Sequence, residues 1–183
     1  MKKVISSLAA AAVIATSGVA SDVNFDTDQA YLIAGAAIEN ADPFDMGVAV
    51  VVGGGVPFMQ AGEGTLVAEA ELTYSVVAPS YDYDFGFYGG SDTVEATFMT
   101  LGAYAGYKYD IDQQFFVKPR VGLIYKSVDF DISGYPGSDS EIGLAFGIQG
   151  GMKLNEQMDV VVGFNLVDGS DITHITGGIQ YRF

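Results

Sequence analysis

Apolar and polar residues alternate in eight separate segments of the chain, and this pattern constrains the fold more than any other feature. The segments span residues 30–39, 45–53, 65–78, 93–109, 115–131, 140–154, 158–167 and 172–183. A period of two residues is typical of a β-strand with two different faces. Each segment is near or above the roughly 9–11 residues with which a tilted strand crosses a bilayer. The sequence therefore predicts an all-β protein of eight antiparallel strands.

The continuous apolar run at the N-terminus has the form of a secretory signal peptide. Two lysines follow Met1, an apolar stretch spans Val4–Thr16, and small residues close the segment at Ala20. The run is shorter than the roughly 20 residues of a transmembrane helix. We expect residues 1–20 to be cleaved, which leaves one domain of residues 21–183.

Hydrophobicity in the rest of the chain is high but dispersed. The sequence is 49% hydrophobic with a mean hydropathy of +0.28, and it contains no Cys. In lipid every backbone N–H and C=O must be bonded within the protein, so a chain without helical spans crosses only as a closed barrel. Without disulfides, such a barrel is held by hydrogen bonds and packing. These features predict an eight-stranded antiparallel transmembrane β-barrel preceded by a cleaved signal peptide.

The polar face of the predicted strands carries every basic residue that follows the leader. These residues are Lys108, Lys118, Arg120, Lys126, Lys153 and Arg182. Gly and Ala fill many other positions on this face, as in a narrow barrel whose bore is filled by side chains. Buried charges are expected to pair. We predict a salt-bridge network of these residues with Glu69 and Glu71, which could meet Lys108. A gated ion path through the same residues is the alternative.

The opposite face of the strands is apolar and ends in aromatic residues. Tyr107, Tyr109, Phe115 and Tyr181 lie near one end of their strands, and Tyr74, Tyr81 and Tyr125 lie nearer the other. This pattern is typical of a lipid-facing band with two interfacial belts. A soluble barrel with an apolar ligand inside would need the reverse orientation, which conflicts with the basic residues on the Gly-rich face.

The connections between the predicted strands differ in length. Asp110–Gln114 and Asn155–Gln157 are short, whereas Pro79–Asp92 and Gly134–Asp139 are longer, as in barrels with short turns at one end and loops at the other. Gly53–Gly64 departs from this habit because it is long for a short-turn position. Its run of three glycines lacks the Lys of a phosphate loop and is interpreted as a flexible turn.

The C-terminal octapeptide Thr176–Phe183 follows the pattern polar-x-Gly-x-x-aromatic-x-aromatic, with Gly178, Tyr181 and Phe183 at its defining positions. It resembles the β-signal by which the barrel assembly machinery recognises bacterial outer-membrane proteins. The resemblance implies a bacterial outer-membrane location and this machinery as a partner during biogenesis.

The central part of the chain strengthens this resemblance. Leu101–Tyr109, a short turn and Phe116–Gly122 are similar to the central hairpin of the OmpX/OmpA-like small barrels, grouped as outer membrane β-barrel domain or porin family proteins. Outer-membrane lipid and lipopolysaccharide are the surroundings that this family implies.

Two features of the expected outer loops bear on binding. Their many carboxylates suit hard divalent cations. Because no loop has the spacing of an EF-hand, a solvated acidic rim is favoured over a weak divalent site shared with lipopolysaccharide phosphates. The second feature is a run of exposed aromatic residues, which predicts a possible contact with a surface partner. That run comprises Tyr81, Tyr83, Phe85, Phe87 and Tyr88.

The residues do not favour catalysis. His174 is the only histidine, and neither Thr176 nor Asp171 completes a deacylase-like arrangement, which needs a nucleophile and an orienting acid. We assign no catalytic residue, cofactor or metal site, and the six basic residues against 23 acidic ones exclude nucleic-acid binding through phosphates. The sequence predicts a non-enzymatic barrel with a structural or surface-interaction role. A narrow ion-conducting pore is the alternative, and a lipid-modifying enzyme is less favoured.

Overall fold

The computed structural model describes residues 25–84, 91–132, 135–167 and 172–183. A short 3-10 helix, η1 (Thr27–Gln29), precedes the first strand. The strands are β1 (Tyr31–Ala41), β2 (Gly47–Ala61), β3 (Gly64–Val77), β4 (Ser80–Asp84), β5 (Ser91–Asp110), β6 (Phe115–Ile132), β7 (Tyr135–Lys153), β8 (Met158–Val167) and β9 (Ile172–Arg182). No helix of these residues is long and apolar enough to cross a membrane.

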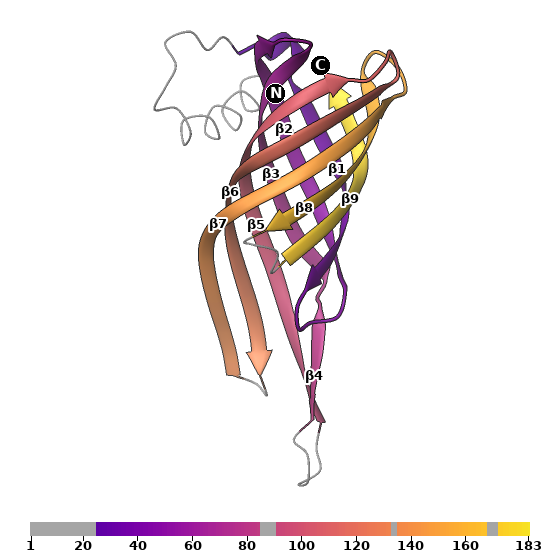
Figure 1. Cartoon of the computed structure of the whole chain (residues 1–183). Coiled ribbons are helices and arrows are strands. Elements are labelled where there is room, and N and C mark those ends of the chain that lie inside the picture. Colours follow the sequence, from indigo (N-terminus) through magenta and orange to yellow (C-terminus); the bar gives the residue numbers. More distant parts are fainter. Residues whose placement is uncertain (1–24, 85–90, 133–134, 168–171) are drawn as a thin grey trace.

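Eight of the strands close into a ring (Figure 1). Their order is β3-β2-β1-β9-β8-β7-β6-β5, and β5 pairs again with β3. Neighbouring strands are antiparallel, including β1 and β9, which join the two ends of the chain. Closure pairs both edges of every barrel strand and leaves no open edge in the ring. The predicted eight-stranded antiparallel barrel is confirmed, and the short strand β4 lies outside the ring.

The two ends of the barrel differ. At the end that holds both ends of the described chain, short turns follow β2, β5 and β7, and we call it the turn end (Figure 1). The opposite end is the loop end. In the turn after β5, the Asp112 carboxylate accepts the N–H groups of Phe115 and Gln114, both at 2.7 Å. These backbone bonds lower the pKa of Asp112. Asn155 accepts two backbone N–H groups in the same way after β7.

The long connection expected at Gly53–Gly64 is wrong, because β2 continues to Ala61. Only Gly62 and Glu63 remain in the turn, and Gly62 takes a φ of 63°, a left-handed conformation that favours glycine. The glycine run lies inside β2 rather than in a flexible turn. At Gly55 a Cβ would lie 2.5 Å from the ring of Tyr31. Gly55 therefore leaves space for the large lumen side chain of Tyr31.

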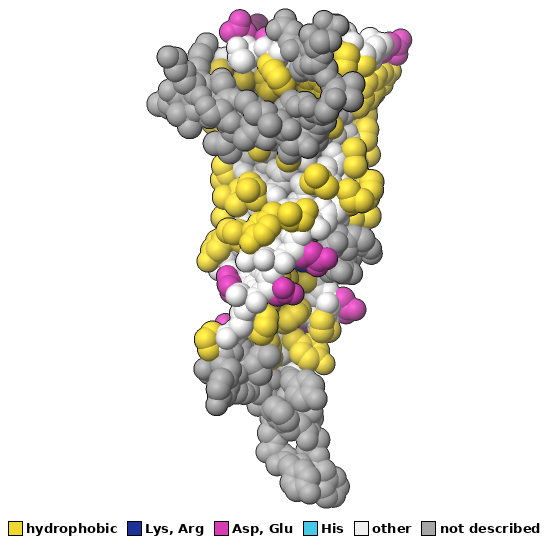
Figure 2. All heavy atoms as spheres, turned by 90° about the vertical axis from the view of Figure 1, so that its left-hand side faces the viewer, with side chains coloured by type: hydrophobic (Ala, Val, Ile, Leu, Met, Phe, Trp, Pro, Cys, Tyr) yellow, Lys and Arg dark blue, Asp and Glu magenta, His cyan; other side chains and the backbone are white. Residues whose placement is uncertain are grey.

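Apolar side chains cover the outside of the barrel and charged ones lie inside. Val52, Val76 and Val162 are each more than half exposed, whereas Glu69 and Lys118 are almost fully buried. On the face shown in Figure 2, a band of hydrophobic side chains covers the barrel wall, with carboxylates above and below it. This is the predicted orientation, and it is the reverse of what a soluble barrel with an apolar ligand needs.

Aromatic side chains point outward near both ends of this apolar surface. Tyr109, Phe115 and Tyr181 are exposed near the turn end, and Tyr74, Tyr81 and Tyr125 are exposed toward the loop end. Tyr107 is half-buried, and its hydroxyl donates a 3.1 Å hydrogen bond to the carbonyl of Ala61. The arrangement suits two membrane interfaces, where a ring has one apolar side and one wet side.

The loop end carries more strand than the sequence pattern predicts. Within the expected loop Pro79–Asp92, β4 pairs with the start of β5, and β7 begins at Tyr135 inside the expected loop Gly134–Asp139. These segments contain polar residues and prolines, so they lack the apolar alternation that predicts a strand. They pair all the same, because backbone hydrogen bonds do not require apolar side chains. The start of β5, the end of β6 and the start of β7 extend the sheet past the barrel ring (Figure 1).

Candidate functional site: a braced lumen and an extended loop end

Glu69 of β3 is the first centre of the charged lumen. Its carboxylate forms an ion pair with Lys118 of β6 and lies 3.5 Å from Arg120 Nη1. The hydroxyl of Tyr31, on β1, donates a 2.6 Å hydrogen bond to the same carboxylate. Lys118 Nζ also lies 3.3 Å from the Tyr31 hydroxyl. A single carboxylate therefore connects three strands.

Arg120 is the second centre. Its Nη2 donates to Glu71 Oε2 at 2.8 Å and to Asn165 Oδ1 at 2.9 Å, and its Nε donates to the same amide oxygen at 3.1 Å. The guanidinium carbon lies 4.4 Å from the centroid of the Tyr104 ring, within cation–π range. The flat guanidinium thus has partners along its edge and over its face.

These contacts join strands that stand opposite one another. In the ring order, β6 and β1 are separated by half the barrel, and so are β3 and β8. The Lys118–Tyr31 contact spans the first diameter, and Glu71 and Asn165 meet on Arg120 across the second. We call Tyr31, Glu69, Glu71, Lys118, Arg120 and Asn165 the cross-brace. Its side chains occupy the bore from wall to wall.

Burial makes each member of the cross-brace depend on the others. The side chains of Lys118 and Arg120 are each 1% exposed. A buried charge without its partner is strongly unfavourable, so removal of one member leaves the rest uncompensated. Small residues supply the space: a Cβ at Gly106 would lie 3.3 Å from Lys118 Cγ.

A second charged group lies at the turn end, and it corrects one expectation. Lys108 does not meet Glu69 or Glu71, because the β3–β5 register sets it opposite Thr65. Its ammonium instead lies 3.8 Å from Asp110. Lys153 lies 2.9 Å from the same carboxylate, and Arg182 lies 2.9 Å from Asp159.

His174 faces the lumen beside an acid, not beside a nucleophile. Its Nε2 lies 3.2 Å from Glu39 Oε1, and Ser75 Oγ donates to Glu39 Oε2 at 2.5 Å. A hydrolase needs the hydroxyl on the histidine, so that the histidine can take its proton. Here the carboxylate separates the two. The two other residues considered for a deacylase-like arrangement add nothing to it: Thr176 is buried in β9, and Asp171 lies outside the described residues.

Apolar side chains fill the lumen between the cross-brace and the loop end. We call this group the apolar cap. It consists of Ala41, Ala96, Phe98, Tyr104, Ile124, Ala145, Val167 and Ile172, with Phe44, Val128 and Phe130 packed against it. Lys126 lies beyond it, 3.7 Å from Glu141. The lumen is thus filled mainly by ion pairs toward the turn end, beside a small apolar cluster that includes Ile33 and Phe116, and mainly by apolar side chains toward the loop end.

The loop end contains part of the predicted aromatic contact. Tyr81 is 37% exposed on β4, and its ring packs edge-on against Phe44 with centroids 6.3 Å apart. Tyr83 follows on β4, paired with Asp92. The remaining predicted contacts, Phe85, Phe87 and Tyr88, lie outside the described residues. Among the residues that are described, no group of three acidic, His or Cys side chains could hold a metal ion.

The residues of the C-terminal pattern lie on the last strand. Tyr181 points outward, and its ring meets that of Phe183 edge-on at 5.4 Å. At Gly178, a Cβ would lie 2.6 Å from the backbone of Ala34 on β1, so the β1–β9 seam is closely packed. Recognition of these residues by the assembly machinery stays a prediction.

Sequence reasoning missed several lumen residues. Asp159 and Asn165 stood on the predicted polar face of their strand but carried no assigned role. Tyr31 lies at the start of the predicted strand 30–39 and Glu39 lies at its end, beside an expected loop, although both side chains are buried in β1. Glu39 could have been found from its spacing: it lies an even number of residues from Tyr31, so both side chains point to the same face of β1.

The barrel fold agrees with a comparison against protein-family models. The model described as "Outer membrane protein beta-barrel domain" matches residues 6–183. The chain belongs to this family. Its place is therefore the bacterial outer membrane, surrounded by lipid and lipopolysaccharide. No curated protein sequence matches the chain.

Solved structures of other outer-membrane barrels are similar to this family member. Ail, the attachment invasion locus protein of Yersinia pestis, aligns over 85% of this chain and 97% of its own, with 14% identity and a TM-score of 0.57. Neisserial surface protein A aligns over 84% and 97%, with 14% identity and a TM-score of 0.55. The N-terminal β-barrel domain of Pseudomonas aeruginosa OprF aligns over 85% and 98%, with 13% identity and a TM-score of 0.52. At these identities the likeness shows the fold alone.

Proposed function

We propose that this outer-membrane barrel has a structural or surface-interaction role without enzymatic activity, and that its lumen is closed. The observation that carries the proposal is the cross-brace, which bridges two diameters of the ring with buried, paired side chains. A lumen filled in this way supports a rigid scaffold for its loop end rather than a passage.

The direction of the barrel follows from its ends. After cleavage of residues 1–20, we expect the assembly machinery to read the pattern that ends at Tyr181 and Phe183. Short turns then face the periplasm and the loop end faces outward, as is usual for barrels with short turns at one end. The extended sheet of the loop end is in this proposal the part that meets other molecules.

Open strand edges support a surface-interaction role. Within the described residues, Tyr135–Leu144 of β7 pair only with β6, because pairing with β8 starts at Ala145. β4 likewise pairs only with β5. An open edge offers backbone N–H and C=O groups to an added strand of a partner. Tyr81 adds an exposed ring beside this sheet.

The ligand of one structural neighbour is not carried over. Ail has been solved in complex with the heparin analogue sucrose octasulfate. That ligand is a polyanion, whereas the described loop end of this chain carries carboxylates such as Asp42, Asp45 and Asp82. Like charges repel, so a polyanion is not the partner that this surface favours.

The proposal is tested by blocking the open edge of β7. The backbone N–H of Ser140 bonds to the side chain of Asp139, which places it off the β6 ladder and on the open edge. Proline lacks this N–H group, so Ser138→Pro with Ser140→Pro removes two N–H groups from the edge, including the one that Asp139 accepts. Ser138→Ala with Ser140→Ala is the matched control that keeps the N–H groups. Faster gel mobility of unboiled protein verifies that each variant folds.

Both variants and the wild type are returned to a strain that lacks the gene. Sensitivity of the cells to detergent reports a structural role, and adhesion to immobilised proteins reports a surface role. We expect the proline variant to lose adhesion while the alanine variant keeps it, with envelope resistance restored by both. Deletion that changes neither property contradicts the proposed role.

A further inference from the structure

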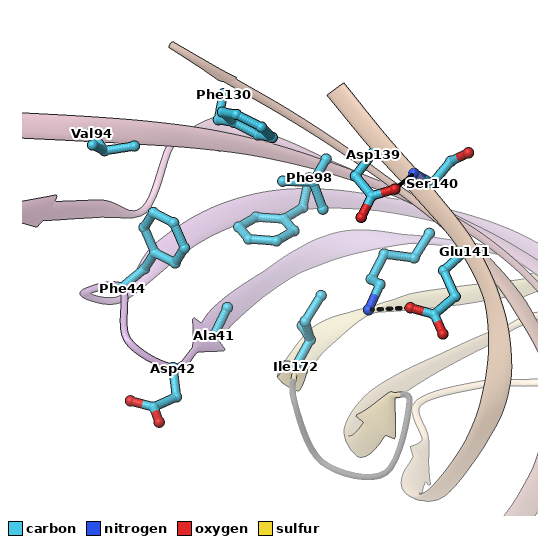
Figure 3. Close-up of a pocket in the computed structure, with 12 residues that line it drawn as sticks. Ala41, Asp42, Phe44, Val94, Phe98, Phe130, Asp139, Ser140, Glu141 and Ile172 are labelled. Carbon is cyan, nitrogen blue, oxygen red and sulfur yellow. Dashed lines mark hydrogen bonds and ion pairs between the residues drawn. The ribbon is translucent and has the colours of Figure 1, made fainter. Parts of the chain in front are cut away.

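A cavity of about 400 Å³ opens at the loop end, directly above the apolar cap. It lies between β1, β5, β6, β7 and β9, where the sheet begins to leave the ring (Figure 3). The apolar cap and the cross-brace close the lumen beneath it. The cavity is therefore a dead end, which can hold a small molecule but not pass it on. Its volume lies within the range of small-molecule sites.

The walls of this cavity are mainly apolar. Phe98, Val128, Phe130 and Ile172 line it, and Phe44 closes one side with its ring edge-on to Phe98, 6.1 Å between centroids. In Figure 3, Phe98, Phe130 and Ile172 extend from three different strands, and Phe44 from the connection between β1 and β2, toward one space. Apolar and aromatic walls favour the apolar part of a ligand, and ring faces also attract a cation.

The charges at the cavity are unbalanced. Asp42, Asp139 and Glu141 stand against one basic lining residue, Lys126, whose ammonium lies 3.7 Å from Glu141. The Asp139 carboxylate accepts a 2.8 Å hydrogen bond from the backbone N–H of Ser140. Within the described part of the chain, no basic side chain forms an ion pair with Asp139. Figure 3 shows Asp139 beside Phe98, on the β7 side of the cavity.

From this arrangement we propose that the cavity binds a small amphipathic cation, with an aromatic or aliphatic body between the phenylalanines and an ammonium group beside Asp139. An anionic ligand would meet the unbalanced carboxylates, and a neutral apolar ligand would leave Asp139 without a counter-charge. Neither the family match nor the closed lumen requires such a site.

The proposal is tested with the folded protein in phosphatidylcholine nanodiscs. The probe is 2-phenylethylammonium, and the neutral comparison is 2-phenylethanol, with empty nanodiscs subtracted. Calorimetric titration should show saturable binding of the cation, at least about fivefold tighter than the alcohol, the effect of one partly exposed ion pair. Equal affinity for the two, or no saturable binding of the cation, overturns the proposal.

Variants locate the charge. Asp139→Asn keeps the side-chain shape and should weaken binding of 2-phenylethylammonium about fivefold, without changing the affinity for 2-phenylethanol. Asp129→Asn removes an exposed carboxylate from the same hairpin, beside the cavity-lining Val128 but on the other face of β6, and should leave both affinities unchanged. Unboiled gel mobility verifies folding. Equal loss in both variants means a general surface-charge effect and contradicts the site.

Discussion

The half of the barrel toward the turn end and the half toward the loop end are closed by different physics. The first is crossed by ion pairs and hydrogen bonds, with Arg120 and Glu69 at their centres. The second is filled mainly by the apolar cap around Phe98 and Ile124, with the buried pair of Glu39 and His174 beside it. In the first half each charged group depends on a specific partner across the bore. In the second half an apolar side chain can pack against any apolar neighbour.

The two halves therefore differ in how strictly they fix the strand register. A charged group inside a barrel is stable only when every partner is in register, so the cross-brace favours one strand register over its neighbours. Apolar side chains tolerate small shifts in packing. The loop end can therefore carry an extended sheet and a cavity without disturbing the braced half.

The sharpest way to break the comparison is to remove the centre of the cross-brace. Arg120→Met leaves Glu69 and Glu71 buried without their arginine, and we expect a loss of about 3–5 kcal/mol in unfolding free energy. Denaturant unfolding in lipid vesicles measures it. The matched control is Lys126→Met at the loop end, where Glu141 is largely exposed, and we expect about 1 kcal/mol or less. Equal losses would mean that the two halves do not differ.

A smaller effect is expected from the apolar cap. Ile124 is 2% exposed, and Ile124→Val removes one methylene from its packing. We expect a loss of about 0.5–1.5 kcal/mol in unfolding free energy, with the ion pairs of the cross-brace intact. The same unfolding assay measures it. A loss as large as that of Arg120→Met would contradict the greater sensitivity of the cross-brace.

The smallest effect is expected at the turn end. Asp112 holds the backbone N–H groups of Phe115 and Gln114, and these bonds lower the pKa of its carboxyl from the ordinary value of 3.8. The contribution of the carboxylate is therefore complete above that value and is lost as the pH falls through the lowered pKa.

An Asp112→Asn variant keeps an acceptor at every pH, as Asn155 does in the other turn. We expect its unfolding midpoint to be close to that of the wild type at neutral pH and to exceed it in strong acid. The measurement is the difference between the two midpoints as the pH is lowered. A difference that does not change with pH contradicts the role of the carboxylate.

The sequence predicts the barrel well because alternation reports burial directly. Lys118 and Arg120 alternate with apolar neighbours, and their inward direction follows from that pattern. It does not report partners: Lys108 was expected beside Glu69, and only the β3–β5 register sets it at the turn end. Nor does it report strands without apolar faces, such as β4, whose pairing depends on backbone bonds.

The central claim, that the cross-brace closes the lumen, is tested most directly by conductance in planar lipid bilayers. The wild type is compared with Ile124→Val, after unboiled gel mobility has verified that both proteins fold. We predict no discrete current steps from the wild type, and none from Ile124→Val. Discrete steps from the wild type itself would contradict the account and establish the narrow pore in its place.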